Sequence, residues 1–277
     1  MNYNFDITSP HNEKIKSIVK LQDNSKRKNS SFFIIEGYAQ VSRAYENSLE
    51  LDSLFICSSI ISDSFQADKI EELINRIKEK NVCVFNCEEK VFDKISYRQN
   101  PDGIIAIAKQ YHYDLFDLEH IIANKKDPFF IICERLEKPG NLGAILRTAD
   151  AAGCDAVIVT DPKVDIFNPN VVRSSIGALF SIPIIVSEGE QIIAFMKKKK
   201  IEIVATALNA KITHTEIDFK KPVAIVMGTE DIGISDIWLK NADNLIEIPM
   251  YGHVNSLNVA NAAAIMLYEI VRQRKLS

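Results

Sequence analysis

Three segments of the chain combine glycines with polar side chains directly after apolar runs. The first, KPGNLGAILRTADAAG (138–153), places Asn141 between Gly140 and Gly143, and Arg147 follows six residues after Asn141. An arginine binds phosphate with two parallel hydrogen bonds or stabilises negative charge that develops on oxygen. Glycines at these positions let the backbone take positive φ and approach a ligand closely. A dinucleotide-binding turn is disfavoured because G-N-L-G lacks the third glycine of that fingerprint.

The second segment, VMGTEDIGIS (226–235), places Glu230 between Gly228 and Gly233 after a strongly apolar run. A loop at the carboxyl end of a parallel strand faces the crevice in which α/β proteins bind ligands. We therefore expect Glu230 to face a ligand.

The third segment, IPMYGHVNSLNVANAAA (248–264), runs from an apolar stretch into a predicted helix. It carries Ser256 and Asn258, whose polar side chains suit a binding site. Both residue types are also common helix N-caps, so helix capping remains the alternative role for each.

Alternating apolar runs and amphipathic stretches must position these segments. Strands are expected at 31–36, 51–57, 81–86, 103–109, 129–133, 155–160, 181–186, 201–208, 223–228 and 244–249. Helices are expected at 11–21, 37–48, 65–79, 88–95, 142–153, 169–179, 188–200, 234–241 and 256–274. Uniformly apolar strands separated by helices predict an α/β fold with a parallel sheet covered on both faces. We expect a smaller α/β domain at 1–110, a linker at 111–127 and a second domain at 128–277.

The helix expected at 256–274 is apolar nearly all round, which predicts burial on most of its sides. Small residues at 260–264 permit the close approach of another helix or of a second subunit. Packing within the chain explains the pattern fully, and a homodimer interface is the further possibility that we consider.

Composition excludes several classes of protein. With 47% apolar and 25% charged residues in 277, the chain is typical of globular domains. We expect no membrane span and no secretory signal. The five scattered cysteines and five histidines match no metal motif, so we expect no metal and reduced thiols in the cytoplasm.

The charge of the chain is unevenly distributed. Residues 1–30 hold six basic and three acidic side chains, a net charge of +3. Since the whole chain has a net charge of −4, the remaining residues carry a net charge of −7. This basic N-terminal arm, which includes Arg27, suits contacts with phosphate, and a solvated lysine-rich helix is the equally plain alternative.

Together the three segments resemble the SpoU family of RNA ribose 2′-O-methyltransferases, within the SPOUT superfamily. The motifs N-x-G-x-x-x-R-x-A, G-x-E-x-x-G-(I/L)-S and I-P-M-x-G-x-x-x-S-L-N-V begin at Asn141, Gly228 and Ile248, and the likeness spans roughly 127–274. Asp231 departs from the glycine usual in the second motif, and we expect the turn to be preserved. Residues 7–37 resemble a substrate-binding domain, with a ribosomal-protein-like fold, that is found in a subgroup acting mostly on ribosomal RNA.

The resemblance implies a trefoil-knotted C-terminal domain, a homodimer and S-adenosylmethionine as cofactor. It assigns cofactor contacts to Gly228, Ile248, Leu257, Ala207 and Met250. It assigns catalysis to Arg147, oriented by Asn141, Glu230, Ser256 and Asn258. Whether Arg147 acts as a base or as a stabilising cation is left open, because a guanidinium normally stays protonated.

RNA contacts are expected from the N-terminal domain and from basic residues such as Lys138 and Arg173. A structural ion pair is the alternative role for Arg173. A methyltransferase that modifies transfer RNA and an RNA-binding protein without catalysis remain the alternative functions.

Overall fold

The computed structural model describes residues 5–208, 210–229 and 232–275. The chain forms two compact units. The N-terminal unit comprises the residues up to Tyr111 together with Asp165–Ser181, and the C-terminal unit comprises His112–Val164 and the residues from Ile182 onward. Neither unit is therefore one continuous stretch of sequence.

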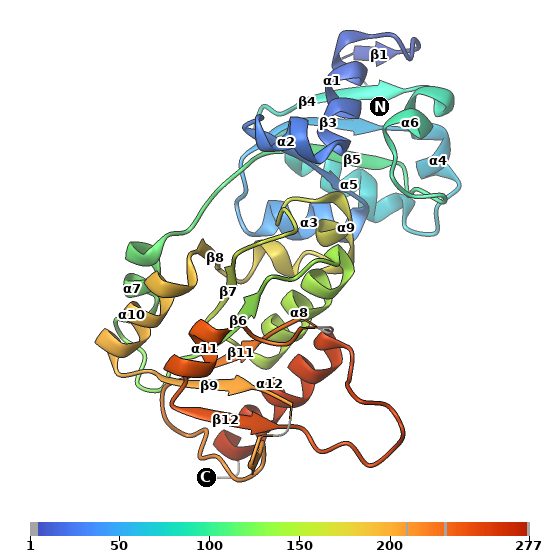
Figure 1. The fold of residues 1–277 in the computed structure, drawn as a ribbon. Coiled ribbons are helices and arrows are strands. Elements are labelled where there is room, and N and C mark those ends of the chain that lie inside the picture. The colour runs from blue at the N-terminus through green and yellow to red at the C-terminus, as the bar shows by residue number, and fades with distance from the viewer. Residues whose placement is uncertain (1–4, 209, 230–231, 276–277) are drawn as a thin grey trace. The chain divides into compact units, whose positions relative to one another are not determined.

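The N-terminal unit is built on a mixed five-stranded sheet (Figure 1). In spatial order its strands are β1 (Phe5–Ile7), β4 (Cys83–Cys87), β3 (Leu51–Ile56), β5 (Ile104–Lys109) and β2 (Phe32–Glu36). The first three run parallel, and β5 is antiparallel to both of its neighbours. The helices are α1 (Glu13–Gln22), α2 (Asn24–Lys28), α3 (Tyr38–Glu46), α4 (Ser58–Ser62), α5 (Ala67–Lys78) and α6 (Glu89–Ile95).

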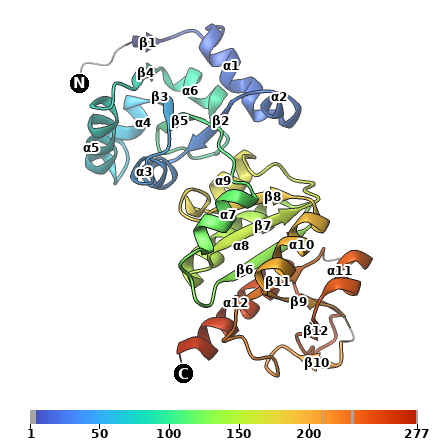
Figure 2. The same cartoon turned by 90° about the vertical axis from the view of Figure 1, so that its left-hand side faces the viewer.

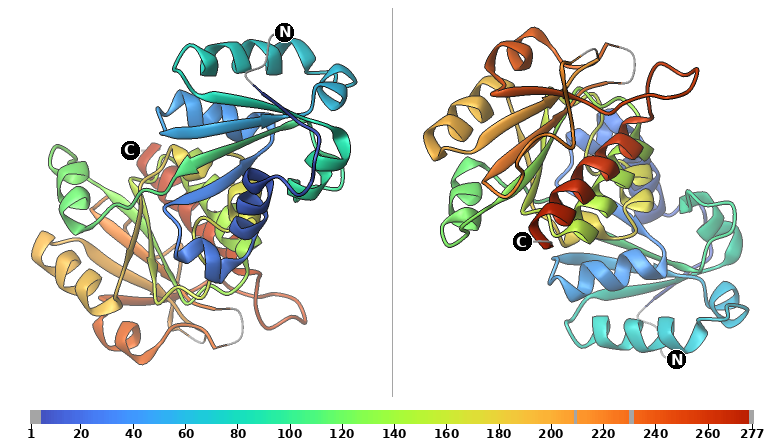
Figure 3. Two further views of the ribbon diagram at one scale, coloured as in Figure 1. Left: turned by 90° about the horizontal axis from the view of Figure 1, so that it is seen from above. Right: turned by 90° about the horizontal axis from the view of Figure 1, so that it is seen from below.

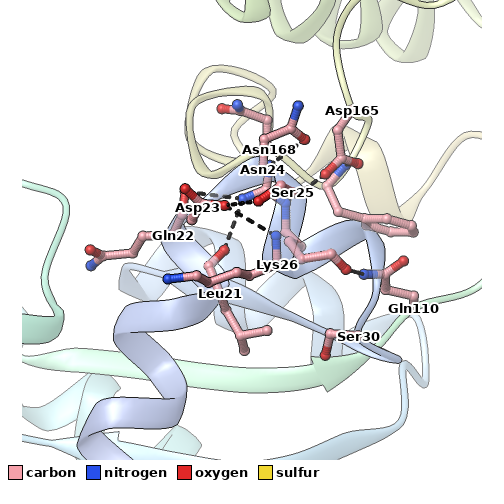
Figure 4. Close-up of polar contacts among 12 residues, drawn as sticks. Leu21, Gln22, Asp23, Asn24, Ser25, Lys26, Ser30, Gln110, Asp165 and Asn168 are labelled. Carbon is pink, nitrogen blue, oxygen red and sulfur yellow. Dashed lines mark hydrogen bonds and ion pairs between the residues drawn. The ribbon is translucent and has the colours of Figure 1, made fainter.

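The segment 165–181 belongs to the N-terminal unit although it lies between two strands of the other unit. It forms α9 (Pro169–Ser174) and the short 3₁₀ helix η1 (Ala178–Phe180). The ring of Phe167 packs on that of Phe33, with 4.5 Å between ring centroids. Asp165 accepts a hydrogen bond from Nε of Arg27 at 2.6 Å (Figure 4). Aromatic packing and a buried ion pair thus fix this segment to the unit.

Arg27 is fully buried, and this corrects the expectation that it belongs to a phosphate-binding arm. Its Nη1 atom also donates to the carbonyl oxygen of Leu21 at 2.8 Å. A buried guanidinium is stable only with such partners, because desolvation of an unpaired charge is costly. The spacing of basic residues alone did not reveal that one of them is structural.

The C-terminal unit contains a seven-stranded, wholly parallel sheet (Figure 2). In spatial order its strands are β10 (Ile212–Thr213), β12 (Asn244–Glu247), β9 (Glu202–Thr206), β11 (Val223–Met227), β6 (Phe129–Glu134), β7 (Ala156–Thr160) and β8 (Ile184–Ser187). Its helices are α7 (Leu115–Ile122), α8 (Pro139–Ala152), α10 (Gly189–Lys199), α11 (Asp236–Asn241) and α12 (Val259–Lys275). Side chains of α7, α10 and α11 form one apolar core with the sheet. Helices α8 and α12 lie side by side away from that core (Figure 3).

The predicted parallel α/β architecture with a preceding α/β domain is confirmed, and the knot stays a prediction. The sequence did not predict β1, α2, α4 or β10, which are short. The expected linker 111–127 contains α7, which belongs to the C-terminal unit. The glycines of the first segment do not use their conformational freedom. Helix α8 already begins at Pro139, so Gly140 and Gly143 are helical, and neither has positive φ.

Helix α12 is less enclosed than predicted. Val259, Ala263 and Met266 are buried, but Ile265 is 37% and Tyr268 is 50% exposed. The prediction of burial on most sides thus failed for one stripe of the helix. Over the described ranges, no helix is long and apolar enough to cross a membrane.

Candidate active site at the carboxyl ends of the parallel strands

Three predicted cofactor contacts follow neighbouring strands of the seven-stranded sheet. Ala207 follows β9, Gly228 follows β11 and Ile248 follows β12. These strands are adjacent and parallel, so the three residues lie at one edge of the sheet. All three are half-buried. The amide of Ala207 donates to the carbonyl oxygen of Ile246 at 2.9 Å, which ties the ends of β9 and β12 together.

The loop after β11 is closed by its own backbone. The amides of Thr229 and Gly233 each donate to the carbonyl oxygen of the other at 3.1 Å. Gly233 has a φ of 74°, the left-handed region that suits glycine. A Cβ on Gly228 would lie 2.2 Å from the carbonyl carbon of Gly233, so only glycine fits there. The predicted catalytic residue Glu230 and its neighbour Asp231 lie outside the described residues.

Glu134, at the end of β6, holds the far side of this loop. Its carboxylate accepts hydrogen bonds from the amide of Ser235 at 2.7 Å and from the hydroxyl of Ser235 at 2.5 Å. Only 1% of Glu134 is exposed. Sequence reasoning missed this residue. The available signal was a carboxylate that directly follows the apolar run FFIIC, where parallel strands present ligand-facing side chains.

The amino ends of α8 and α12 meet through two predicted catalytic residues. Nδ2 of Asn258 donates to Oδ1 of Asn141 at 3.2 Å. Oδ1 of Asn258 accepts from the amide of Ala260 at 3.1 Å, so Asn258 is also the N-cap of α12. The capping role considered for Asn258 is thus confirmed, and it coexists with a contact between the first and third segments.

The remainder of the third segment projects from the sheet. Residues 251–256, including Ser256, are exposed, and Tyr251 is 96% exposed. Met250 and Leu257, at the two ends of this stretch, are half-buried. No hydrogen bond joins Ser256 to Asn141 or Asn258, and its place among the catalytic residues stays a prediction.

Arg147 is exposed on α8, six residues after Asn141. Six residues of α-helix advance about 9 Å along the axis. Among residues 5–208, 210–229 and 232–275, no hydrogen bond or ion pair involves the guanidinium of Arg147. No hydrogen bond joins it to Asn141 or Asn258, and its convergence with the predicted cofactor residues stays a prediction.

Two cysteines of the C-terminal unit, Cys133 and Cys154, are buried. Burial raises the pKa of the Cys154 thiol to about 12, and it also raises the pKa of Cys133. A protonated thiol is a poor nucleophile. Within the described part of the chain, no three side chains of His, Cys, Asp or Glu are grouped as metal ligands.

Two family models cover most of the chain. The model of the SpoU rRNA Methylase family matches residues 128–268, which is more than half of the chain. The chain belongs to the SpoU rRNA methylase family. The MRM3-like substrate binding domain matches residues 12–106. The SpoU match includes all five predicted catalytic residues and also the segment 165–181, which folds with the N-terminal unit.

Characterised SpoU relatives resemble the chain over most of its length. It is 28% identical to the 23S rRNA (guanosine(2553)-2′-O)-methyltransferase RlmP of Bacillus subtilis, over 95% of this chain and 98% of the relative. It is 34% identical to the 23S rRNA (guanosine-2′-O-)-methyltransferase RlmB of Vibrio parahaemolyticus, over 76% and 85%.

Solved SpoU-type structures share both units. An AdoMet-bound rRNA methyltransferase from Sinorhizobium meliloti has a TM-score of 0.85 and 30% identity, and the alignment covers 96% of this chain and 97% of that one. The SpoU methyltransferase AviRb from Streptomyces viridochromogenes, in complex with AdoMet, has a TM-score of 0.84 and 26% identity, with coverage of 96% and 99%.

Proposed function

We propose that this chain transfers a methyl group from S-adenosylmethionine to a ribose 2′-hydroxyl of ribosomal RNA. The observation that carries the proposal is the hydrogen bond between Asn141 and Asn258, which joins the first and third family motifs beside the strand ends. Relatives that match over nearly their whole length act on 23S rRNA. That agreement favours ribosomal over transfer RNA.

The strand ends fit the cofactor. Adenine needs backbone donors and acceptors within an apolar slot, and half-buried Ala207, Ile248, Met250 and Leu257 supply apolar side chains. Gly228 keeps backbone exposed where a side chain has no room. When bound, S-adenosylmethionine supplies an electrophilic methyl group on a positively charged sulfur.

Arg147 would bind the RNA phosphate or stabilise the charge that develops on the ribose oxygen. The planar guanidinium of Arg147 offers two parallel N–H donors, which suit both tasks. The ammonium group of a lysine does not reproduce this geometry. Asn141, Ser256 and Asn258 would orient the ribose, and Glu230 is assigned the same task. We therefore expect Arg147→Ala and Arg147→Lys to lose most of the activity.

A homodimer in the cytoplasm completes the proposal. Ile265 and Tyr268 form an exposed apolar stripe on α12. This stripe supports a dimer in which a second copy of the chain packs against α12. All five cysteines are free thiols, which agrees with a reducing compartment.

The experiment that tests the function maps 2′-O-methylated riboses in ribosomal and transfer RNA, with and without the gene. One 23S rRNA position should lose its methyl group and regain it on complementation, but not with Arg147→Ala. If deletion of the gene removes 2′-O-methylation only from transfer RNA, the substrate is transfer RNA and not ribosomal RNA. Unchanged methylation, together with no calorimetric binding of S-adenosylmethionine, would favour an RNA-binding protein without catalysis.

A further inference from the structure

A polar cleft of about 740 Å³ opens in the N-terminal unit. Side chains that carry hydrogen-bond donors or an aromatic ring dominate its lining, among them Gln40, Tyr97, Arg98, Gln99, Asn100 and Arg173. Most of them come from α3 and from the loop between α6 and β5. Arg173 comes from α9, so the segment 165–181 completes this cleft.

A buried carboxylate holds the loop that carries Tyr97 and Arg98. Glu36, at the end of β2, is 7% exposed. It accepts hydrogen bonds from the hydroxyl of Ser96 at 2.5 Å, from the amide of Tyr97 at 2.8 Å and from the amide of Arg98 at 3.3 Å. The backbone under these side chains is therefore ordered before any ligand arrives, which lowers the entropic cost of binding.

The guanidinium of Arg98 is held in place from several sides. Its Nη2 atom donates to Oε1 of Gln40 at 3.1 Å, and its Nη1 atom donates to Oδ1 of Asp102 at 3.4 Å. A Cβ on Gly37 would lie 2.4 Å from Nη2, so this position leaves space for the arginine. An arginine has five N–H donors. Two are used here, and buried Nε has no partner among the described residues.

The contribution from the segment 165–181 includes an exposed arginine and a residue with positive φ. Arg173 is exposed and makes no ion pair with any residue that the structure describes, so the structural role considered for it finds no support. Its carbonyl oxygen accepts from Nε2 of Gln40 at 3.2 Å, which ties α9 to α3. Ile176, also in the lining, has a φ of 50°, which a β-branched residue rarely adopts. Such strain concentrates at functional sites.

We propose that this cleft binds one unpaired nucleotide of the RNA substrate, through residues distinct from those predicted for methyl transfer. This inference rests on the proposed function. Arg98 and Arg173 bind the phosphate, the half-exposed ring of Tyr97 stacks on the base, and the amides of Gln99 and Asn100 meet the base edge. Single-stranded RNA is recognised by this combination of stacking, edge hydrogen bonds and guanidinium groups.

The test measures binding of the full-length protein to an unmethylated 23S rRNA transcript across a range of salt concentrations. Tyr97→Ala should weaken binding about tenfold, whereas Tyr97→Phe keeps the stacking face and the affinity. Arg173→Gln should lower the slope of log affinity against log salt by about 0.7, the value for one lost phosphate contact. Lys80→Gln removes an exposed cation away from the cleft and should leave the slope unchanged.

Thermal unfolding and calorimetric binding of S-adenosylmethionine should be unchanged in all four variants. If Tyr97→Ala and Arg173→Gln bind the transcript like the wild type, the cleft proposal is overturned while the methyltransferase assignment stands. If the wild type binds the transcript without methylating it, the proposed function fails and weaker binding by the cleft variants still supports the cleft. Absence of binding to both the 23S transcript and total transfer RNA overturns both proposals.

Discussion

Two loops at the same edge of the parallel sheet differ in how they are held. The held loop, described at 228–229 and 232–235, is closed by paired backbone hydrogen bonds and anchored by buried Glu134. The projecting segment, 251–256, is exposed throughout (Figure 1). Both carry family motifs. The contrast indicates that hydrogen bonds within the chain hold the described ends of the first loop, whereas the side chains of the projecting segment face solvent.

The largest effect is expected from a matched pair of glycine substitutions. Gly228→Ala forces a methyl group into the backbone of the held loop and should lower the free energy of unfolding by about 3 kcal/mol. Gly252→Ala adds a methyl group to open space in the projecting segment and should be nearly neutral. Chemical denaturation measures both, and equal stabilities would contradict the contrast.

Removal of the Glu134 carboxylate should lower the free energy of unfolding somewhat less than Gly228→Ala does. Glu134→Ala leaves the amide of Ser235 without its hydrogen-bond acceptor. We expect the free energy of unfolding to fall by about 2 kcal/mol. Glu137→Ala, which truncates an exposed carboxylate three residues later, is the matched control and should change little. Denaturation curves compare the two variants. A Glu134→Ala protein as stable as the control would show that the held loop does not depend on its anchor.

The junction between the projecting segment and α12 should show an intermediate effect. Asn258→Ala removes the N-cap of α12 and should lower the free energy of unfolding by about 1 kcal/mol. Asn258→Ser keeps a capping oxygen but lacks the amide that donates to Asn141, so stability should largely return while methyl transfer does not. Thermal unfolding and single-turnover methylation measure the two outcomes, and full activity in Asn258→Ser would separate the Asn141 contact from catalysis.

The smallest effect is expected within the projecting segment. Tyr251→Ser should change the free energy of unfolding by less than about 0.5 kcal/mol, because the side chain is almost fully exposed. Denaturation at a protein concentration low enough to dissociate oligomers provides the measurement. A loss above about 1 kcal/mol there would mean that the segment packs against the chain itself.

Sequence patterns predicted the regular architecture well, because apolar periodicity reports which faces of strands and helices are buried. The runs FFIIC and VAIVM became β6 and β11 close to the predicted bounds. The three residues of β1 were too few to show any periodicity. Burial of individual charges was also hidden, since a partner such as Asp165 lies 138 residues from Arg27.

The site was predicted in part, for similar physical reasons. Glycine and asparagine motifs located the strand ends and singled out Asn141 and Asn258, but they did not predict the hydrogen bond between these two residues. Glu134 and the cleft around Arg98 escaped notice because neither follows from local spacing. Glu134 meets Ser235 across 101 residues, and Gln40 meets Arg98 across 58. Contacts of this kind become visible only when the chain is folded.

The placement of residues 165–181 in the N-terminal unit sets an order for biosynthesis. A ribosome completes the five-stranded sheet early, but Phe167 and Asp165 emerge only after β6, α8 and β7 have been made. Until then Phe33 and Arg27 lack the neighbours that bury them. The N-terminal unit therefore cannot complete its core until β6, α8 and β7 of the other unit have been made.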